Sequence, residues 1–265
     1  MNNRFFNLYS HGFARVAVAI PRCRIADPAY NVEQTIALAR QAAQQGAALV
    51  AFPELGLSAY SCDDLFHQRA LLDACEEGLA AVVEASRELP VAMVVGLPLR
   101  VNHQLFNCAA VVAGGRVQGL VPKSFLPNYG EFYESRQFSA ADSAAVDSVA
   151  LFGEQVPFGP NQVFEVENFP LLRFHVEICE DVWVPVPPSS FAAMAGATAG
   201  SASTSGPSTS RFHATECFTS SVACSAKYLR TSPATPRRFS PSLTSSARPG
   251  AVSSMAPSAP MAWNA

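Results

Sequence analysis

The front part of the chain alternates between short apolar runs and a longer stretch with apolar residues at helical spacing. Residues 15–20 (RVAVAI) form an apolar run before a proline, which is typical of a buried strand. Asn31 with Gln34 three residues later matches a capping box, so we expect a helix to begin there and to end at Gly46. The apolar run over residues 48–52 predicts a second strand. This order of strand, helix and strand is typical of an α/β protein.

A second helix and a set of strands follow in the pattern. Apolar spacing predicts an amphipathic helix over residues 71–86, and then a strand over residues 91–96 that Pro98 is expected to end. Two more apolar runs lie on either side of Gly114 and Gly115, which predicts a hairpin with a tight turn.

Beyond this hairpin the pattern changes to loops and short strands. Residues 139–150 are small and polar and predict a surface loop, and residues 156–166 predict another hairpin. From Arg173 to Ile178 apolar residues alternate with polar or charged ones, which predicts a strand.

Three of the expected strands end on a chemically reactive side chain. Glu54 follows the second strand after one proline, Lys123 follows the hairpin, and Cys179 follows the last strand. Alone, each has an ordinary interpretation, as a turn acid, a surface lysine and a small buried hydrophobic residue. Together they indicate a shared site, because a cysteine that enters a tight turn presents its sulfur at the rim of a sheet. The backbone N–H of Glu180 would face an oxyanion there.

The sequence blocks around these residues resemble, in order and spacing, those of the nitrilase (carbon–nitrogen hydrolase) superfamily. The three blocks are Phe52 to Glu54, Lys123 to Phe138 and Glu177 to Asp181. The longer segments around these blocks resemble the glutaminase domains of bacterial glutamine-dependent NAD synthetases. The segments that carry this resemblance are YSHGFAR from Tyr9, PELGLSAYS from Pro53, FLPNYGEFYE from Phe125 and VEICEDVWVPVPP from Val176. The resemblance runs from about Tyr9 to Thr198.

The resemblance implies a fold and a chemistry. The fold is an α/β fold, the α-β-β-α sandwich of the nitrilase type. Cys179 would be the nucleophile that attacks an amide, and Glu54 the general base that later returns its proton to the departing ammonia. Lys123 would stabilise the tetrahedral intermediate, with the amide of Glu180 as the other donor.

Three further residues are substrate-binding candidates by the same resemblance. Glu134 matches a second acid that supports the lysine and the substrate pocket, and its alternative is a simple salt bridge to Arg136 or Lys123. Tyr129 would line the pocket for the amino-acid end of glutamine. Tyr60 is a further candidate, with a half-buried packing aromatic as its alternative.

Composition and charge exclude several classes of protein. The chain has 265 residues, 49% of them hydrophobic, which suffices for one sizeable domain. A net charge of -3 gives no sign of a nucleic-acid partner. No apolar run has the length of a signal sequence or a membrane span. Seven irregularly spaced cysteines without a CxxC pair suggest reduced thiols in the cytoplasm and no metal site.

The chain changes character at about Thr198. Residues 199–265 include 16 Ser, 12 Ala, 7 Thr and 7 Pro, and six bases against the single acid Glu216 give a net charge of +5. We therefore expect a hydrolase domain over residues 9–198 and a low-complexity tail that buries too little apolar surface to fold. A native disordered tail and a shifted reading frame of a GC-rich gene both fit. The second is favoured, since the family-like sequence stops inside an expected helix.

The resemblance also implies an activity that these residues do not contain. In the family, ammonia passes to a synthetase domain that uses ATP and Mg²⁺ to amidate nicotinic acid adenine dinucleotide, and its SGGxDS loop does not occur here. We expect no cofactor on the glutaminase domain itself. The implied partners are glutamine, the synthetase domain of the full-length enzyme and further copies in a homo-oligomer. A sandwich incomplete at its C-terminal end leads us to expect little or no activity from the chain as it stands.

Two other hypotheses stay open. The first is a stand-alone amidase or nitrilase of the same superfamily that acts on another amide or nitrile, which the missing synthetase domain motivates. The second is a non-catalytic interaction protein whose basic tail binds acidic partners, and only the charge of the tail supports it.

Overall fold

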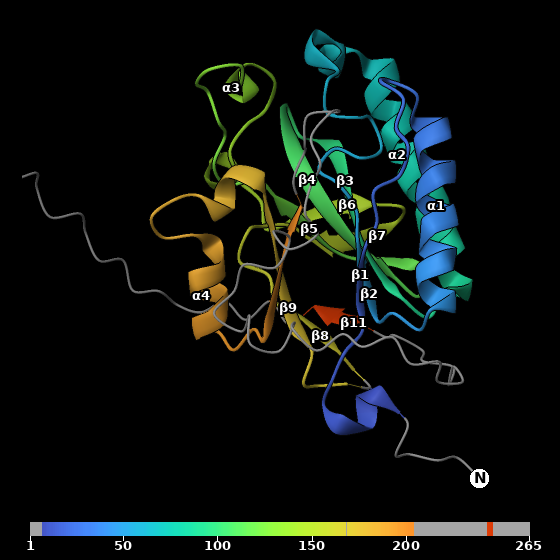
Figure 1. The fold of residues 1–265 in the computed structure, drawn as a ribbon. Coiled ribbons are helices and arrows are strands. Elements are labelled where there is room, and N and C mark those ends of the chain that lie inside the picture. Colours follow the sequence, from blue (N-terminus) through green and yellow to red (C-terminus); the bar gives the residue numbers. More distant parts are fainter. Residues whose placement is uncertain (1–6, 168, 204–242, 246–265) are drawn as a thin grey trace, which may run out of the picture.

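The computed structural model describes residues 7–167 and 169–203, and a short strand at residues 243–245 (Figure 1). The sequence predictions for the rest of the tail lie outside these residues. Within the described ranges, no helix combines the length and the apolar character that a membrane span needs.

Two β-sheets pack face to face, and helices lie on both outer faces (Figure 1). Helices α1 (Pro28–Gln44) and α2 (Arg69–Ala85) cover the first sheet, and α4 (Pro188–Met194) lies on the second. The predicted α-β-β-α arrangement is therefore confirmed. The cover of α4 explains why five of the six residues of the Arg173–Ile178 strand are buried, the polar ones included.

The first sheet has five strands in chain order, with parallel pairing among the first three and antiparallel pairing among the last three. The strands are β1 (Val16–Val18), β2 (Leu49–Ala51), β3 (Ala92–Val101), β4 (Gln104–Ala113) and β5 (Arg116–Pro122). The predicted hairpin around Gly114 and Gly115 is the β4–β5 pair, and both glycines have positive φ.

The second sheet has the order β10-β9-β8-β11, and a separate hairpin joins β6 to β7. The elements are β6 (Ser148–Leu151), β7 (Glu154–Pro157), β8 (Phe164–Val166), β9 (Arg173–Ile178), β10 (Ala199–Ser203) and β11 (Leu243–Ser245). β10 is parallel to β9 and begins one residue after the domain boundary that the composition suggested. Short helical segments complete the fold: η2 (Leu8–His11), η3 (Asp63–His67), η4 (Ser86–Glu88), α3 (Glu134–Gln137), η5 (Ala141–Ser143) and η6 (Cys179–Val182).

The buried apolar residues form two clusters, one on each face of the first sheet. Along β2, Val50 packs toward the helices, whereas Leu49 and Ala51 pack toward the second sheet. Successive side chains of a strand point to opposite faces, so a short apolar run without polar residues belongs to a strand covered on both sides. The first sheet is therefore the central layer that holds the fold together.

The N-cap of the first helix lies four residues earlier than predicted. Asp27 is its N-cap and accepts a hydrogen bond from the N–H of Tyr30, while Pro28 occupies the first helical position, where it needs no N–H partner. Asn31, the predicted cap, is fully buried inside the helix and donates to the carbonyls of Arg24 and Leu57. A side chain that satisfies loop carbonyls was mistaken for a cap.

The prediction that Pro98 ends its strand is wrong, since β3 continues to Val101. Asn107 lies opposite Pro98 and accepts a hydrogen bond from the N–H of Lys123 on the other side. Pro98 and Asn107 are therefore a pair without mutual hydrogen bonds, and the missing N–H of the proline faces away from β4. β2 has already ended on that side, so no ladder bond is lost.

The predicted hairpin over residues 156–166 is also wrong, because its two halves belong to different sheets. β7 pairs with β6 through Phe152 and Gly153, both of which have positive φ, as a two-residue hairpin turn requires. β8 pairs instead with β9. The predicted loop over residues 139–150 accordingly ends in β6.

Candidate active site

Glu54 lies just beyond the end of β2, in a turn that packs tightly against β3. Its side chain is fully buried. A Cβ placed on Gly96 of β3 would lie 2.5 Å from the N of Leu55 and 2.6 Å from the O of Pro53, so only glycine allows this approach. Leu55 itself has a φ of 51°, an uncommon value outside glycine. The close packing fixes the backbone on both sides of the carboxylate.

Lys123 follows β5 and is held by the neighbouring strand. Its N–H donates to the carbonyl of Asn107 on β4 at 2.8 Å, which extends the β4–β5 ladder by one bond. The side chain is 0% exposed, which is rare for lysine unless the charge is paired. The ladder therefore aims an ammonium group into the interior at the edge of the first sheet.

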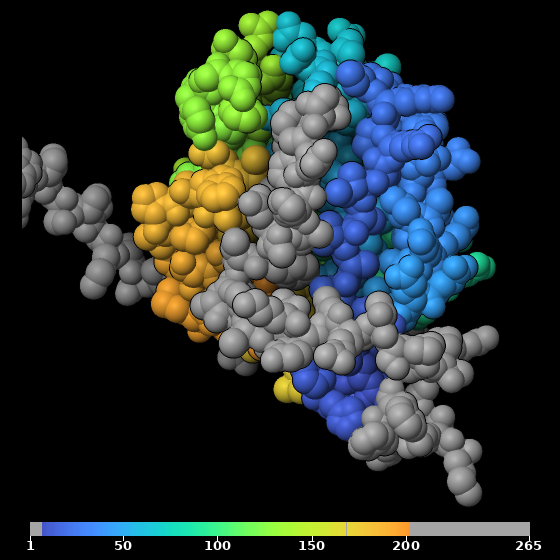
Figure 2. Space-filling model, in the orientation of Figure 1, coloured from blue at the N-terminus to red at the C-terminus, as the bar shows by residue number. Residues whose placement is uncertain are grey.

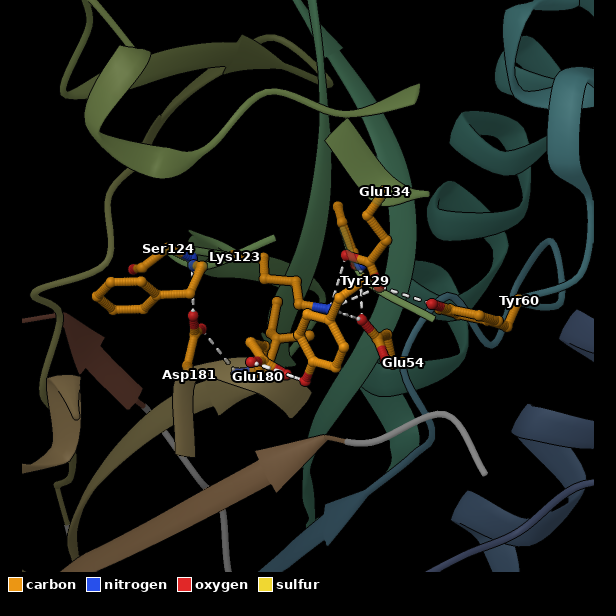
Figure 3. A network of polar contacts seen from close by, with 11 residues as sticks. Glu54, Tyr60, Lys123, Ser124, Tyr129, Glu134, Glu180 and Asp181 are labelled. Atoms are coloured by element: carbon orange, nitrogen blue, oxygen red, sulfur yellow. Dashed lines mark hydrogen bonds and ion pairs between the residues drawn. The ribbon is translucent and has the colours of Figure 1, made fainter. Parts of the chain in front are cut away.

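The ammonium group of Lys123 joins two buried carboxylates (Figure 3). Its Nζ lies 2.7 Å from Oε1 of Glu54 and 2.7 Å from Oε2 of Glu134. The amide of Asn107 donates to Oε1 of Glu54 at 2.7 Å, and the hydroxyl of Tyr60 donates to Oε1 of Glu134 at 2.7 Å. We call these five residues the buried network. Each donor and carboxylate named here has a partner of opposite character, as charges away from water need.

The buried network keeps its lysine charged. Burial alone would lower the pKa of Lys123, but Glu54 and Glu134 outweigh it, and the pKa is raised. Burial and the neighbouring Glu54 raise the pKa of Glu134, although Lys123 opposes them. A permanent cation beside two acids is suited to stabilising negative charge that develops on a bound substrate.

Cys179 follows β9 and is the first residue of η6. It is partly buried and has a φ of 48°, the left-handed region that residues other than glycine seldom adopt. Burial first and Glu54 second raise the pKa of this thiol to about 12, although Lys123 lowers it. The thiol is therefore protonated at neutral pH, and it needs a base before it can act as a nucleophile.

Tyr129 and Glu180 form a pair at the surface beside Cys179. The hydroxyl of Tyr129 lies 3.1 and 3.0 Å from the two carboxylate oxygens of Glu180, and 61% of Tyr129 is exposed. The carboxylate of Glu180 also acts to raise the pKa of the Cys179 thiol. On the face shown in Figure 2, the segment around α3 lies directly next to η6 and α4 at the surface. Both residues of the pair belong to these two segments.

The structure brings the predicted site residues together from three strand ends. Glu54, Lys123, Glu134 and Tyr60 share the buried network, and the charges of the first three act on Cys179. Of the two salt-bridge alternatives for Glu134, the partner is Lys123. Arg136 pairs instead with Asp64 at 2.9 Å on the surface.

Two functional residues were missed at the sequence level. Asn107 is fully buried in the middle of the apolar run LFNCAAVV, and a polar residue in such a run is itself a signal. Asp181 is 1% exposed and accepts three backbone N–H bonds, whereas in the sequence it marks only the end of the third block. Burial raises the pKa of Asp181 to about 7, although these donors lower it.

The described part of the chain contains no set of side chains grouped as metal ligands. Among those residues, no three His, Cys, Asp or Glu side chains are grouped as a metal site would need.

Comparisons with known proteins agree with this geometry. Residues 15–212 match the family model of carbon–nitrogen hydrolases. The chain is 46% identical to a glutamine-dependent NAD(+) synthetase from Mycobacterium tuberculosis over an alignment of 194 residues. This alignment covers 73% of this chain and 28% of that protein. The chain thus spans under a third of this relative.

Solved structures extend the comparison. The crystal structure of a glutamine-dependent NAD(+) synthetase from Cytophaga hutchinsonii has a TM-score of 0.62 at 25% identity, covering 72% of this chain and 30% of that one. An amidase from Nesterenkonia sp. has a TM-score of 0.53 at 23% identity over 72% of this chain and 64% of its own, which shows a shared fold. Since the family match includes all three strand ends that form the site, the chain belongs to the carbon–nitrogen hydrolase family.

Proposed function

We propose that the site on this chain is built to hydrolyse the side-chain amide of glutamine through a thioester on Cys179. The observation that carries the proposal is the buried network of Glu54, Lys123 and Glu134, whose charges act on the thiol of a strained strand-end cysteine. The choice of glutamine is supported by the relatives, which are named glutamine-dependent NAD(+) synthetases.

The first half of the reaction forms the thioester. Glu54 accepts the thiol proton while the sulfur of Cys179 attacks the carboxamide carbon, and the C=O π electrons move to oxygen. The resulting oxyanion is stabilised by the ammonium of Lys123 and the backbone N–H of Glu180. The C–N bond then breaks, and the nitrogen takes the proton from Glu54 and leaves as ammonia.

The second half releases glutamate. Glu54, again a carboxylate, removes a proton from a water molecule as the water oxygen attacks the thioester carbon. The same two donors stabilise the second tetrahedral intermediate. The C–S bond breaks, the thiolate recovers the proton from Glu54, and the site returns to its starting state. Glu134 and Tyr60 hold Lys123 in place throughout.

The exposed pair is proposed to bind the amino-acid end of the substrate. The carboxylate of Glu180 matches an α-ammonium group, and the hydroxyl of Tyr129 can donate to an α-carboxylate or support Glu180. Both lie beside Cys179 at the surface, so a substrate held there would extend its amide inward toward the buried network.

The wider role is proposed from the relatives. The ammonia would supply an ATP-dependent amidation of nicotinic acid adenine dinucleotide to NAD on a synthetase domain, where ATP and Mg²⁺ would be used. Glutamine hydrolysis itself is proposed to need no cofactor. A homo-oligomer in the cytoplasm is the setting that fits these relatives.

The test is covalent capture by a glutamine analogue. The 265-residue chain is incubated with 6-diazo-5-oxo-norleucine, and the modified peptide is identified by mass spectrometry. We expect one equivalent of label on Cys179, and we expect excess glutamine to protect it. Capture needs a single bond-forming event, so it does not depend on fast turnover.

The other buried cysteines serve as internal controls. Cys62, Cys75 and Cys108 should remain unlabelled. Label on one of these instead of Cys179 would contradict the catalytic assignment. Alkylation of Cys179 by iodoacetamide without capture by the glutamine analogue would keep the hydrolase and reject glutamine, leaving an amidase for another amide or nitrile.

A further inference from the structure

Asp181 joins the two strand ends that carry the cation and the nucleophile. Its Oδ1 accepts hydrogen bonds from the N–H of Ser124 at 3.0 Å and of Phe125 at 2.8 Å, and its Oδ2 accepts from the N–H of Ile178 at 3.0 Å (Figure 3). Ser124 and Phe125 directly follow Lys123 beyond β5 of the first sheet. Ile178 is the last residue of β9 in the second sheet. One carboxylate therefore ties both sheets together at the site.

The same carboxylate closes the turn that contains the nucleophile. The bond from Ile178 to Asp181 spans Cys179 and Glu180, so the side chain folds back over the residue whose φ is 48°. Such strained backbone persists only where several surrounding contacts hold it in place, and it is concentrated at functional sites. Asp181 is 1% exposed, and its three hydrogen bonds are contacts of that kind.

We propose that Asp181 is a positioning residue that fixes the sulfur of Cys179 and the N–H of Glu180 relative to the ammonium of Lys123. The proposal deepens the proposed function and rests on it for the reaction concerned. Without the carboxylate, the turn is free to relax to an ordinary φ, and the sulfur moves out of its buried place. The two donors to the oxyanion then no longer converge on one point.

Asn is a discriminating replacement at this position. Its side chain has one carbonyl oxygen, and its amide nitrogen cannot accept a hydrogen bond, so Asp181→Asn loses at least one of the three bonds in either orientation. Asp181→Ala loses all three. Asp147→Asn makes the same chemical change at an exposed carboxylate outside the site and is the matched control.

The experiment measures two reactions of Cys179 in the 265-residue chain. The first is capture by 6-diazo-5-oxo-norleucine, resolved into the maximal rate and the inhibition constant KI. The second is alkylation by iodoacetamide, which needs no glutamine site. Peptide mass spectrometry follows Cys62, Cys75 and Cys108 in the same samples as monitors of global opening.

The two reactions are expected to change in opposite directions. In Asp181→Asn the maximal capture rate should fall by about 100-fold, since a displacement of about 1 Å has that cost, while KI changes less than about threefold. Alkylation of Cys179 should accelerate by about tenfold or more, because burial is the main factor that suppresses its thiolate. Asp181→Ala should show larger changes of the same sign, and Asp147→Asn neither.

Other results would overturn the proposal. Unchanged capture and alkylation in Asp181→Asn would show that the three bonds position nothing. Equal acceleration at all four cysteines would show that Asp181 serves stability alone. Failure of the glutamine analogue on the wild-type chain would instead reject the proposed substrate, and the iodoacetamide measurement would still decide the role of Asp181.

Discussion

The proposed base and the cation of the site, on the first sheet, are held in a different way from the proposed nucleophile, on the second. Glu54 and Lys123 are fixed by side-chain bonds inside the buried network, under two helices of 17 residues each. Cys179 is held by the shape of its backbone turn, on a sheet that one seven-residue helix covers. The two sheets pack face to face, and their functional side chains lie at the ends of their strands.

This difference separates stability from reactivity. Removing a member of a buried ion network leaves an uncompensated charge, so changes on the first sheet affect the fold as well as the chemistry. The turn at Cys179 carries strain and an uncharged thiol, so changes there affect chemistry with little effect on the fold. Substitutions in the first sheet and in the turn at Cys179 test this separation of stability from reactivity.

The largest expected effect is that of Cys179→Ala. Capture by the glutamine analogue and any release of ammonia should disappear, because the atom that forms the thioester is missing. The free energy of unfolding should change by less than about 1 kcal/mol, since a partly buried side chain is shortened by one atom. Labelling by mass spectrometry and urea unfolding measure the two quantities.

Cys62→Ala is the control, and it should show the opposite pattern. Cys62 lies in the core of the first sheet and donates to the carbonyls of Ser58 and Ala59. It should lose about 1 kcal/mol of stability or more and keep capture at Cys179. Strong destabilisation by Cys179→Ala would contradict the division between the two regions.

Lys123→Met should damage both properties. The substitution leaves Glu54 and Glu134 buried without their cation, which should cost about 3–5 kcal/mol of stability. It also removes an oxyanion donor, so capture should slow by about 100- to 1,000-fold. Urea unfolding and capture kinetics on the folded fraction measure both changes.

Arg116→Met, at the start of β5, the strand that Lys123 follows, is the matched control. Arg116 forms an exposed ion pair with Glu154, and such pairs contribute about 0–1 kcal/mol. It should leave capture unaltered. If Lys123→Met cost no more stability than this surface change, the buried network would not be the stabilising element described here.

The pH dependence of alkylation sharpens the comparison from the side of the nucleophile. Because burial raises the pKa of Cys179 to about 12, its alkylation by iodoacetamide should rise about tenfold per pH unit between about pH 7 and pH 10. The urea-unfolded chain should level off above about pH 9, near the ordinary thiol value. A plateau in the native chain near neutral pH would instead indicate a resident thiolate paired with Lys123.

The same shift has a consequence for stability. Above about pH 9 the unfolded chain loses the thiol proton that the native chain retains up to about pH 12, so the native state binds more protons. The contribution of Cys179 to stability is therefore present below about pH 9 and is lost as the pH rises through this window. Cys179→Ala should lessen that loss.

The positions of the three proposed catalytic residues were predictable because each follows an apolar strand, whereas their roles came from the resemblance. Apolar runs reveal strands covered on both faces, and the charged or reactive residue after each run marks the rim of a sheet. Glu54, Lys123 and Cys179 were found in this way, and the sandwich followed from the resemblance. An apolar run and the residue that follows it are adjacent in the sequence, so no contact between distant segments is needed to find these positions.

The missed features depend on contacts between distant segments. Asn107 acts on Glu54 only because β2, β3 and β4 pair in one register, and Asp181 acts on Ser124 only because two sheets meet. Pro98 was misjudged for the same reason, since its tolerance depends on where β2 ends. Hydrogen bonds across strands are not visible in the pattern of one chain segment.

The smallest expected effect is that of Tyr60→Phe, which removes one bond at the outer edge of the buried network. The hydroxyl of Tyr60 donates to Glu134 at 2.7 Å, and burial, with Glu134 next, raises the pKa of the phenol, so it remains a donor at every practical pH. Glu134 keeps both of its contacts with Lys123 in the variant. We expect a loss of about 1–2 kcal/mol in stability, as for a hydrogen bond to a charged group, and capture slower by only a few-fold. Tyr30→Phe, on α1 outside the site, should change neither quantity. If Tyr60→Phe slowed capture by more than 100-fold with stability unchanged, Tyr60 would have to contact the substrate itself. Its role would then go beyond the support of Glu134 and Lys123.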